Sequence, residues 1–148
     1  MELTVTGKRK LSGEIMVSSA KNAVLPILAA ALLSSEQVII HRLPEIDDVS
    51  VITELINNVG INTKQKGDSL IIDGDIKNYK PPYELVKQIR ASFLILGPVL
   101  AKKGAVRIAL PGGCAIGSRP VDLHLKGFAA LGADISFSKG DVVAKADK

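Results

Sequence analysis

Apolar positions in this chain follow two spacings, one typical of helices and one of strands. Residues 23–33 are apolar throughout, and they contain Pro26. Proline is tolerated in the first turn of a helix, so the pattern predicts a helix that begins near Asn22. A second helical pattern spans residues 83–103, and a kink or break is expected at residues 97–98, a Gly-Pro pair.

Two shorter helices are predicted by the same spacing. Apolar residues recur every three or four positions from residue 49 to residue 59, and either Asp47 or Asp48 is expected to cap this helix. Gly60 is expected to end it. The last helix is predicted over residues 120–131.

Short segments of β-branched and alternating residues predict strands, with turn residues between them. Two strands are expected before the first helix, and two hairpins are expected around residues 67–68 and 139–141. The expected strands are residues 2–5, 14–17, 38–41, 62–66, 70–73, 105–110, 135–137 and 142–144.

The two halves of the chain follow one plan. In each half a strand is followed by a helix that ends at a glycine, Gly60 or Gly132, and then by a hairpin that contains Gly67 or Gly140. The offset is about 72 residues, which is long for a solenoid repeat and indicates a duplicated supersecondary module.

Composition narrows the class of protein. The chain of 148 residues is 47% hydrophobic but only 3% aromatic, so an aliphatic core of a layered α/β domain is expected. The net charge of +4 comes from scattered basic residues with few aromatics between them, which argues against a nucleic-acid partner and favours small phosphorylated ligands.

Cysteine content and hydropathy argue against disulfide-rich, zinc-binding and membrane proteins. A single cysteine cannot form an intramolecular disulfide framework or a typical structural zinc site, so no metal is expected. The eleven-residue apolar run at residues 23–33 is too short to span a bilayer, and the first residues lack a signal-peptide pattern. No membrane association and a cytoplasmic location are therefore expected.

Residues 110–120 form the segment with the strongest sign of chemistry. Three of its residues are glycine, which allow close approach of the backbone to a ligand, and they surround Cys114. Arg119 nearby would lower the pKa of the thiol. Local features leave two interpretations open, a reactive Cys114 or an inert, buried one.

Two further places could bind anions. The amides at the start of the first helix point outward beside Lys21, which favours an anion there. The alternative is a helix capped by Ser19 or Asn22, with Lys21 in solvent. Arg90 lies in an apolar stretch and needs an anionic partner or a water-filled cleft, unless its side chain extends to the surface.

Three segments in order resemble the UDP-N-acetylglucosamine 1-carboxyvinyltransferase family, the enolpyruvyl transferases that begin peptidoglycan precursor synthesis. These are Ala-Lys-Asn-Ala-Val-Leu-Pro-Ile-Leu at residues 20–28, Ile-Arg-Ala-Ser at residues 89–92, and residues 110–124 around Cys114. The resemblance implies an inside-out α/β barrel, or α/β prism, of repeated βαβαββ modules. Residues 1–20 would be strands that pack on a second domain, and residues 21–148 would supply about two of the three modules of the first domain.

The resemblance also implies a reaction. The enolpyruvyl group of phosphoenolpyruvate is transferred to the 3-hydroxyl of UDP-N-acetylglucosamine, without a redox cofactor. Cys114 resembles the proton donor, which can form an adduct with phosphoenolpyruvate. Fosfomycin, which mimics that substrate, is expected to add to this thiol, as intact mass would reveal. Lys21, Asn22 and Arg119 resemble phosphoenolpyruvate contacts. The nucleotide-sugar contacts are matched by Arg90, Arg119, Pro120, Val121, Asp122 and Leu123.

Family members are far longer than this chain, and their second domain supplies a carboxylate base that has no counterpart here. A fragment with little or no turnover of its own is therefore expected. A non-catalytic fragment that binds a nucleotide sugar, or serves only a structural role, is one alternative. A transferase acting on shikimate 3-phosphate is another, which the Cys114 segment disfavours. Apolar faces and sheet edges left uncovered would favour self-association.

Overall fold

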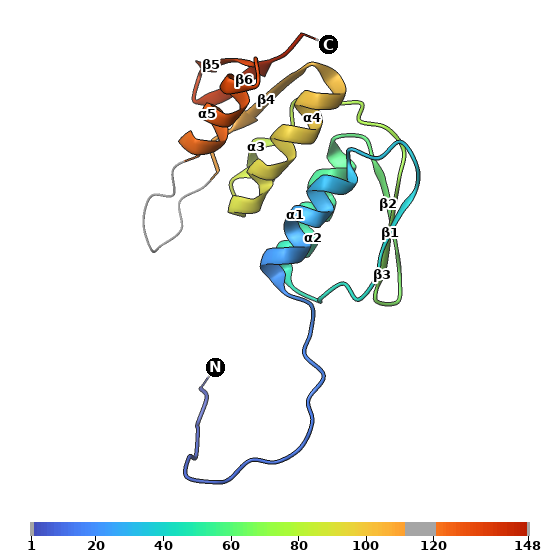
Figure 1. Cartoon of the computed structure of the whole chain (residues 1–148), viewed down its shortest axis with the longest axis vertical. Coiled ribbons are helices and arrows are strands. Elements are labelled where there is room, and N and C mark those ends of the chain that lie inside the picture. Colours follow the sequence, from blue (N-terminus) through green and yellow to red (C-terminus); the bar gives the residue numbers. More distant parts are fainter. Residues whose placement is uncertain (1, 112–120, 148) are drawn as a thin grey trace.

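The computed structural model describes residues 2–111 and 121–147. The chain forms two three-stranded antiparallel sheets, each with helices packed on one face. In Figure 1 helices α1 to α4 lie in the middle of the molecule and the sheets lie at its periphery. This arrangement, with helices inside and sheets outside, agrees with the predicted α/β class.

The first repeat has the order α1 (Lys21–Ala31), β1 (Val38–Ile40), α2 (Asp47–Asn58), β2 (Asn62–Lys66) and β3 (Ser69–Asp73). The second repeat has α3 (Tyr83–Val86), the 3-10 helix η1 (Arg90–Ile95), α4 (Leu96–Lys103), β4 (Ala105–Ala109), α5 (Asp122–Ala130), β5 (Asp134–Ser138) and β6 (Asp141–Lys145). The predicted hairpins and the predicted duplication are confirmed.

Both sheets have the same topology. The last strand of each repeat is the central one, so the orders are β1-β3-β2 and β4-β6-β5. Val38 pairs with Ile72 in one sheet, and Val106 pairs with Ala144 in the other. The side chains on this face are buried or partly buried, which fixes the register, because a shift of one residue would turn the apolar set toward solvent.

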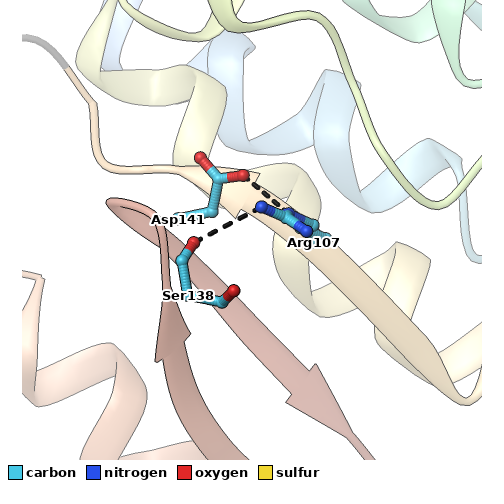
Figure 2. A network of polar contacts seen from close by, with 3 residues as sticks. All are labelled: Arg107, Ser138 and Asp141. Atoms are coloured by element: carbon cyan, nitrogen blue, oxygen red, sulfur yellow. Dashed lines mark hydrogen bonds and ion pairs between the residues drawn. The ribbon is translucent and has the colours of Figure 1, made fainter.

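Polar contacts of Arg107 stabilise the second sheet (Figure 2). Its Nε donates to Asp141 Oδ2 at 2.7 Å, and Nη2 donates to the Ser138 carbonyl at 3.4 Å. The guanidinium therefore joins β4 to the end of the β5–β6 hairpin. The position paired in the same way in the first sheet is Ile39, opposite Ile71, so the two sheets reach the same pairing with different side chains.

The predicted strands at residues 2–5 and 14–17 are wrong for this structure. Residues 2–20 run away from the helices without strand pairing (Figure 1), and their large apolar side chains are exposed. A strand requires a hydrogen-bonded neighbour, and the described residues provide none for this segment. The first repeat begins at α1 and the second at α3, each without the first strand of the expected βαβαββ module.

The helical segment over residues 83–103 is broken, as predicted, but the predicted position of the break at residues 97–98 is wrong. The segment divides into α3, η1 and α4, and the break falls at residues 87–89. Pro98 causes no break because it lies in the first turn of α4, where proline is tolerated. By contrast, Pro26 lies in the second turn of α1 rather than the first, and it removes the N–H that would bond the Asn22 carbonyl.

Candidate active site

The start of α1 presents backbone N–H groups that no side chain caps. The residue before the helix, Ala20, is extended, and it makes no side-chain capping bond. The alternative, a cap by Ser19 or Asn22, is wrong, because no side chain caps this helix and Ser19 Oγ donates to the Arg42 carbonyl at 2.6 Å. The helix begins with Lys21 and Asn22, so both side chains lie beside amides that favour an anion.

Lys21 is paired with a carboxylate from the next helix. Its Nζ lies 2.8 Å from Asp48 Oδ2. The predicted cap of α2 by Asp47 or Asp48 is wrong, since Ile46 occupies that position and makes no side-chain capping bond. Both aspartates instead lie in the first turn, where the helix dipole favours negative charge. Asp48 thereby faces Lys21, which is half exposed but does not lie free in solvent.

A buried serine shapes the turn that carries Arg90. Ser92 is fully buried, and its Oγ lies 2.6 Å from the Val86 carbonyl oxygen and 2.5 Å from that of Ile89. A hydroxyl has one hydrogen, so it can donate to one of these carbonyls at a time. The contacts close the turn between α3 and η1 and leave Arg90 exposed at the start of η1.

These segments surround one pocket of about 620 Å³, a volume typical of small-molecule sites. It brings together four predicted site residues that are far apart in the sequence: Lys21, Asn22, Arg90 and Val121. Its full lining comprises Lys21, Asn22, Leu25, Pro26, Asp48, Lys87, Gln88, Ile89, Arg90, Ala91, Phe93, Leu94, Val121 and His124.

Positive charge exceeds negative charge around this pocket. Lys21, Lys87 and Arg90 line it, and Asp48 is the acidic residue among the described lining residues. Lys87 Nζ pairs with the carboxylate of Glu84, a hydrogen bond that raises the pKa of Lys87 above its usual value. The pocket is therefore suited to an anionic ligand.

The predicted nucleotide-sugar residues at the start of α5 differ in placement. Val121 precedes the helix, is buried and lines the pocket. Asp122 and Leu123 follow it in the first turn, where both are exposed, and neither lines the pocket. Asp122 Oδ2 lies 3.9 Å from Lys126 Nζ, a weak surface pair.

Cys114, Arg119 and Pro120 lie outside the described residues. Their predicted roles therefore remain predictions. Pro111 and Val121, the described residues on either side of this segment, follow β4 and precede α5. Val121 joins one end of the segment to the pocket.

Sequence reasoning missed other residues of the pocket. Asp48 was expected only as a helix cap, and Lys87 carried no motif. His124 stacks edge-on against Phe93, with ring centroids 6.1 Å apart and an interplanar angle of 83°. Glu84 and Lys87 are three residues apart, and this spacing was a signal that could have found their ion pair. Their position beside the pocket depends on the break after α3, which no local pattern marks.

Within residues 2–111 and 121–147, no three His, Cys, Asp or Glu side chains are grouped closely enough to hold a metal ion. The helices in these ranges are also too short or too polar to cross a membrane.

Comparison with known proteins identifies relatives along nearly the whole chain. Residues 5–148 match the family described as EPSP synthase (3-phosphoshikimate 1-carboxyvinyltransferase). UDP-N-acetylglucosamine 1-carboxyvinyltransferase 1 of Caldanaerobacter subterraneus is 55% identical over 138 residues, which are 93% of this chain and 33% of that protein. UDP-N-acetylglucosamine 1-carboxyvinyltransferase of Psychrobacter arcticus is 47% identical over 148 residues, which are 99% of this chain and 35% of that protein.

Solved structures share the fold. The enolpyruvyl transferase NikO from Streptomyces tendae matches with a TM-score of 0.78 and 23% identity, over 96% of this chain and 32% of that one. EPSP synthase from Acinetobacter baumannii matches with a TM-score of 0.65 and 17% identity, over 90% and 32%. The chain spans about a third of the length of the curated relatives it matches.

Proposed function

The chain belongs to the EPSP synthase (3-phosphoshikimate 1-carboxyvinyltransferase) family, and we propose that its pocket is the part of an enolpyruvyl transferase site that binds phosphoenolpyruvate and UDP-N-acetylglucosamine. One observation carries the proposal. Lys21, Asn22, Arg90 and Val121, which the sequence motifs single out, line a single pocket.

The chemistry of the pocket supports phosphoenolpyruvate as the donor. This substrate carries a phosphate and a carboxylate. The uncapped start of α1 supplies backbone N–H donors, and Lys21 supplies a cation beside them. Asp48 holds Lys21 at 2.8 Å in the free protein. The Lys21 ammonium would therefore have two negative partners when an anion binds, the anion itself and the Asp48 carboxylate.

UDP-N-acetylglucosamine is favoured as the acceptor by the curated relatives. Two of them, at 55% and 47% identity, are named for that substrate. The family description names 3-phosphoshikimate instead, so shikimate 3-phosphate is the second candidate. Arg90 and Val121 line the pocket and would contact the nucleotide sugar, with Asp122 and Leu123 beside them. Arg119 and Pro120 belong to the same proposal.

The reaction proposed for the complete site balances as follows. Cys114 protonates the methylene carbon C3 of phosphoenolpyruvate, and the 3-hydroxyl oxygen bonds to C2 as its proton passes to the carboxylate base that the resemblance assigns to the second domain. The tetrahedral intermediate then returns a proton from C3 to the Cys114 thiolate and loses phosphate from C2, which restores the double bond and the thiol. Fixed cations such as Lys21 and Arg119 would stabilise the phosphate. This chain takes the binding and proton-donating roles.

Enolpyruvyl transfer to this nucleotide sugar would place the protein in peptidoglycan synthesis, and hence in cell-wall biogenesis, cell shape and cell division. Fosfomycin sensitivity belongs to the same proposal, because the proposal assigns a reactive thiol to Cys114. A cytoplasmic location is also part of it.

Calorimetric titration of the 148-residue chain with UDP-N-acetylglucosamine tests the pocket. We expect saturable binding that Arg90→Gln weakens about tenfold or more, the effect of losing a hydrogen bond to a charged group. Lys64→Gln is the matched control, since Lys64 is an exposed cation of β2 outside the pocket lining. It should leave the affinity unchanged.

A parallel titration with shikimate 3-phosphate decides the acceptor. Tighter binding of shikimate 3-phosphate would overturn the choice of UDP-N-acetylglucosamine. No binding of either compound at millimolar concentration would overturn the proposed pocket and leave a structural role.

A further inference from the structure

One chemistry-bearing side chain of the pocket has no role in the proposed reaction. His124 lines the pocket and lies in the first turn of α5. It is also the last residue of the third segment that resembles the transferase family. Histidine is the side chain whose charge changes near neutral pH, so a pocket that contains one can change its charge with pH.

Packing against other rings fixes the place of His124. Its ring meets that of Phe93 edge to face, with centroids 6.1 Å apart and an interplanar angle of 83°. Phe93 is buried and belongs to η1, which packs on α1, α2 and α4. One turn further along α5, Phe128 lies so close to Gly97 that a Cβ there would be 3.2 Å from Phe128 Cζ. Two contacts one turn apart thereby hold α5 against the helices that form the pocket.

The ring nitrogens of His124 are available to a ligand. The other histidine, His41, has its Nδ1 2.9 Å from Ser69 Oγ. His124 is exposed and makes no such hydrogen bond within residues 2–111 and 121–147. A ring N–H at the wall of a pocket can donate to a ligand that enters it.

The charged groups that face the pocket are mainly cations. Lys21, Lys87 and Arg90 line it, and its acidic lining residue, Asp48, lies 2.8 Å from Lys21 Nζ. Among the described lining residues, a protonated imidazole would therefore find no carboxylate that is not already paired. An anion bound between these cations would supply a negative partner to the imidazole as well.

The elements around α5 add no carboxylate to this part of the pocket. Asp122 of the same helix pairs with a lysine, and Asp134 begins β5, which packs on α5. Neither aspartate is among the residues that line the pocket. The charged residues of α4 are Lys102 and Lys103, in its last turn. Within the described residues, a negative partner for His124 in the pocket must come from a ligand.

We propose that His124 is an additional binding residue of the pocket, which in its protonated form donates a ring N–H to an anionic ligand. The nucleotide sugar as that ligand rests on the proposed function, whereas the anion contact itself can be tested separately. Because binding and protonation are linked, an anion that contacts the imidazolium binds with uptake of a proton. Affinity for anions therefore rises as the pH falls through the range in which histidine gains its charge.

UDP-N-acetylglucosamine suits the test because its own charge is constant in this range. Each phosphate of its diphosphate is a diester or an anhydride and keeps one negative charge near neutral pH. Lysine, arginine and aspartate side chains also keep their charges between about pH 6 and 8. Phosphoenolpyruvate is less suitable, because a phosphate monoester takes up a proton near about pH 6.

Calorimetric titration of the 148-residue chain with UDP-N-acetylglucosamine at about pH 6 and about pH 8 measures the linkage. The wild type should bind about tenfold more tightly at the lower pH, the effect of a hydrogen bond to a charged group. His124→Gln should remove most of this difference. His41→Gln, the matched control outside the pocket lining, should keep it. Saturable wild-type binding of equal affinity at both pH values would overturn this inference and leave the proposed pocket in place.

Two further variants separate the charge of His124 from other effects. His124→Lys supplies a cation at both pH values, so its affinity should not depend on pH. Cys114→Ser removes a thiol whose charge could also change in this range, and the pH dependence should persist without it. Loss of the pH dependence in the Cys114→Ser chain would assign it to the thiol and overturn the role of His124. Circular dichroism checks that each variant is folded.

Ring-proton NMR tests the anion contact without the nucleotide sugar. The chain has two histidines, so the two glutamine variants assign their signals. Sulfate, whose charge is constant near neutral pH, should move the His124 signal toward that of protonated imidazole, and sodium chloride of equal ionic strength should not. A His124 signal that does not move, or that moves no more than the His41 signal, would overturn the contact. A sulfate response without binding of the nucleotide sugar would support the contact and overturn the proposed function.

Discussion

The side chain of Ser92 is fully buried, and its hydroxyl lies between the carbonyl oxygens of Val86 and Ile89. These two carbonyls bracket the break between α3 and η1. Arg90, at the first position of η1, owes its place on the pocket edge to this turn. One small polar side chain therefore links the packing of the core to the position of a cation in the candidate site.

Removal of this hydroxyl is expected to destabilise the protein. Ser92→Ala removes the hydroxyl that can donate to the Val86 carbonyl, whereas the Ile89 carbonyl keeps the Ser92 backbone N–H as a donor at 3.3 Å. An unsatisfied buried acceptor costs about 1–3 kcal/mol. Urea unfolding followed by circular dichroism measures the loss. Ser50→Ala, at an exposed position of α2, should change stability by less than about 0.5 kcal/mol. Equal stability of the two variants would contradict this role for Ser92.

At the scale of elements, helices α2 and α5 are both followed by a glycine with positive φ, but the two glycines have different surroundings. Gly60 follows α2 with φ +102°, and Gly132 follows α5 with φ +97°. Both conformations favour glycine. A Cβ on Gly60 would lie 2.7 Å from Lys77 Cβ and 2.9 Å from Lys77 N, whereas a Cβ on Gly132 would meet no atom within 4 Å.

The two glycines therefore separate backbone strain from crowding. Gly132→Ala should cost about 1–2 kcal/mol through its positive φ alone. Gly60→Ala carries the same strain, and the close approach of the Lys77 backbone should add about 1–3 kcal/mol. Thermal or urea unfolding of both variants gives the difference. A cost for Gly132→Ala equal to or above that for Gly60→Ala would show that the contact with Lys77 yields easily.

At the scale of the whole molecule, the buried side chains form one cluster that includes both repeats. Lys102 of α4 adds a polar link, donating to the Ser34 carbonyl at 2.8 Å and to Ser35 Oγ at 3.2 Å. Among the described residues, both repeats contribute side chains to this shared cluster. The two repeats are expected to fold and unfold as a unit.

Matched core substitutions test this cooperativity. Leu55 belongs to the first repeat and Leu96 to the second, and each is 0% exposed. Leu55→Ala and Leu96→Ala should each lower the free energy of unfolding by about 2–5 kcal/mol. Each should shift one common transition, seen alike by circular dichroism and by the fluorescence of Tyr79 and Tyr83. A variant that splits the transition into two would contradict a shared core.

Patterns within the sequence were sufficient where local physics decides the structure. The spacing of apolar residues predicted α2, and the turn residues around Gly67 and Gly140 predicted both hairpins, because a tight turn fixes the register of its strands. The duplication was visible because each half of the chain has a helix that ends at a glycine and is followed by a hairpin. The caps were not predictable, since Asp47 and Asp48 suit the first turn of a helix as well as the position before it.

The sequence by itself determined the α/β class, the repeat, the family and the identity of most candidate site residues, because periodicity, turn chemistry and motifs are local properties. Only the tertiary structure decided that Lys21 faces Asp48 and that Arg90 begins a separate 3-10 helix. It also decided which apolar faces are covered. These features depend on packing between residues far apart in the chain. Helices α2 and α5 therefore end with matching backbone hydrogen bonds, yet Val59 is buried and Leu131 is exposed.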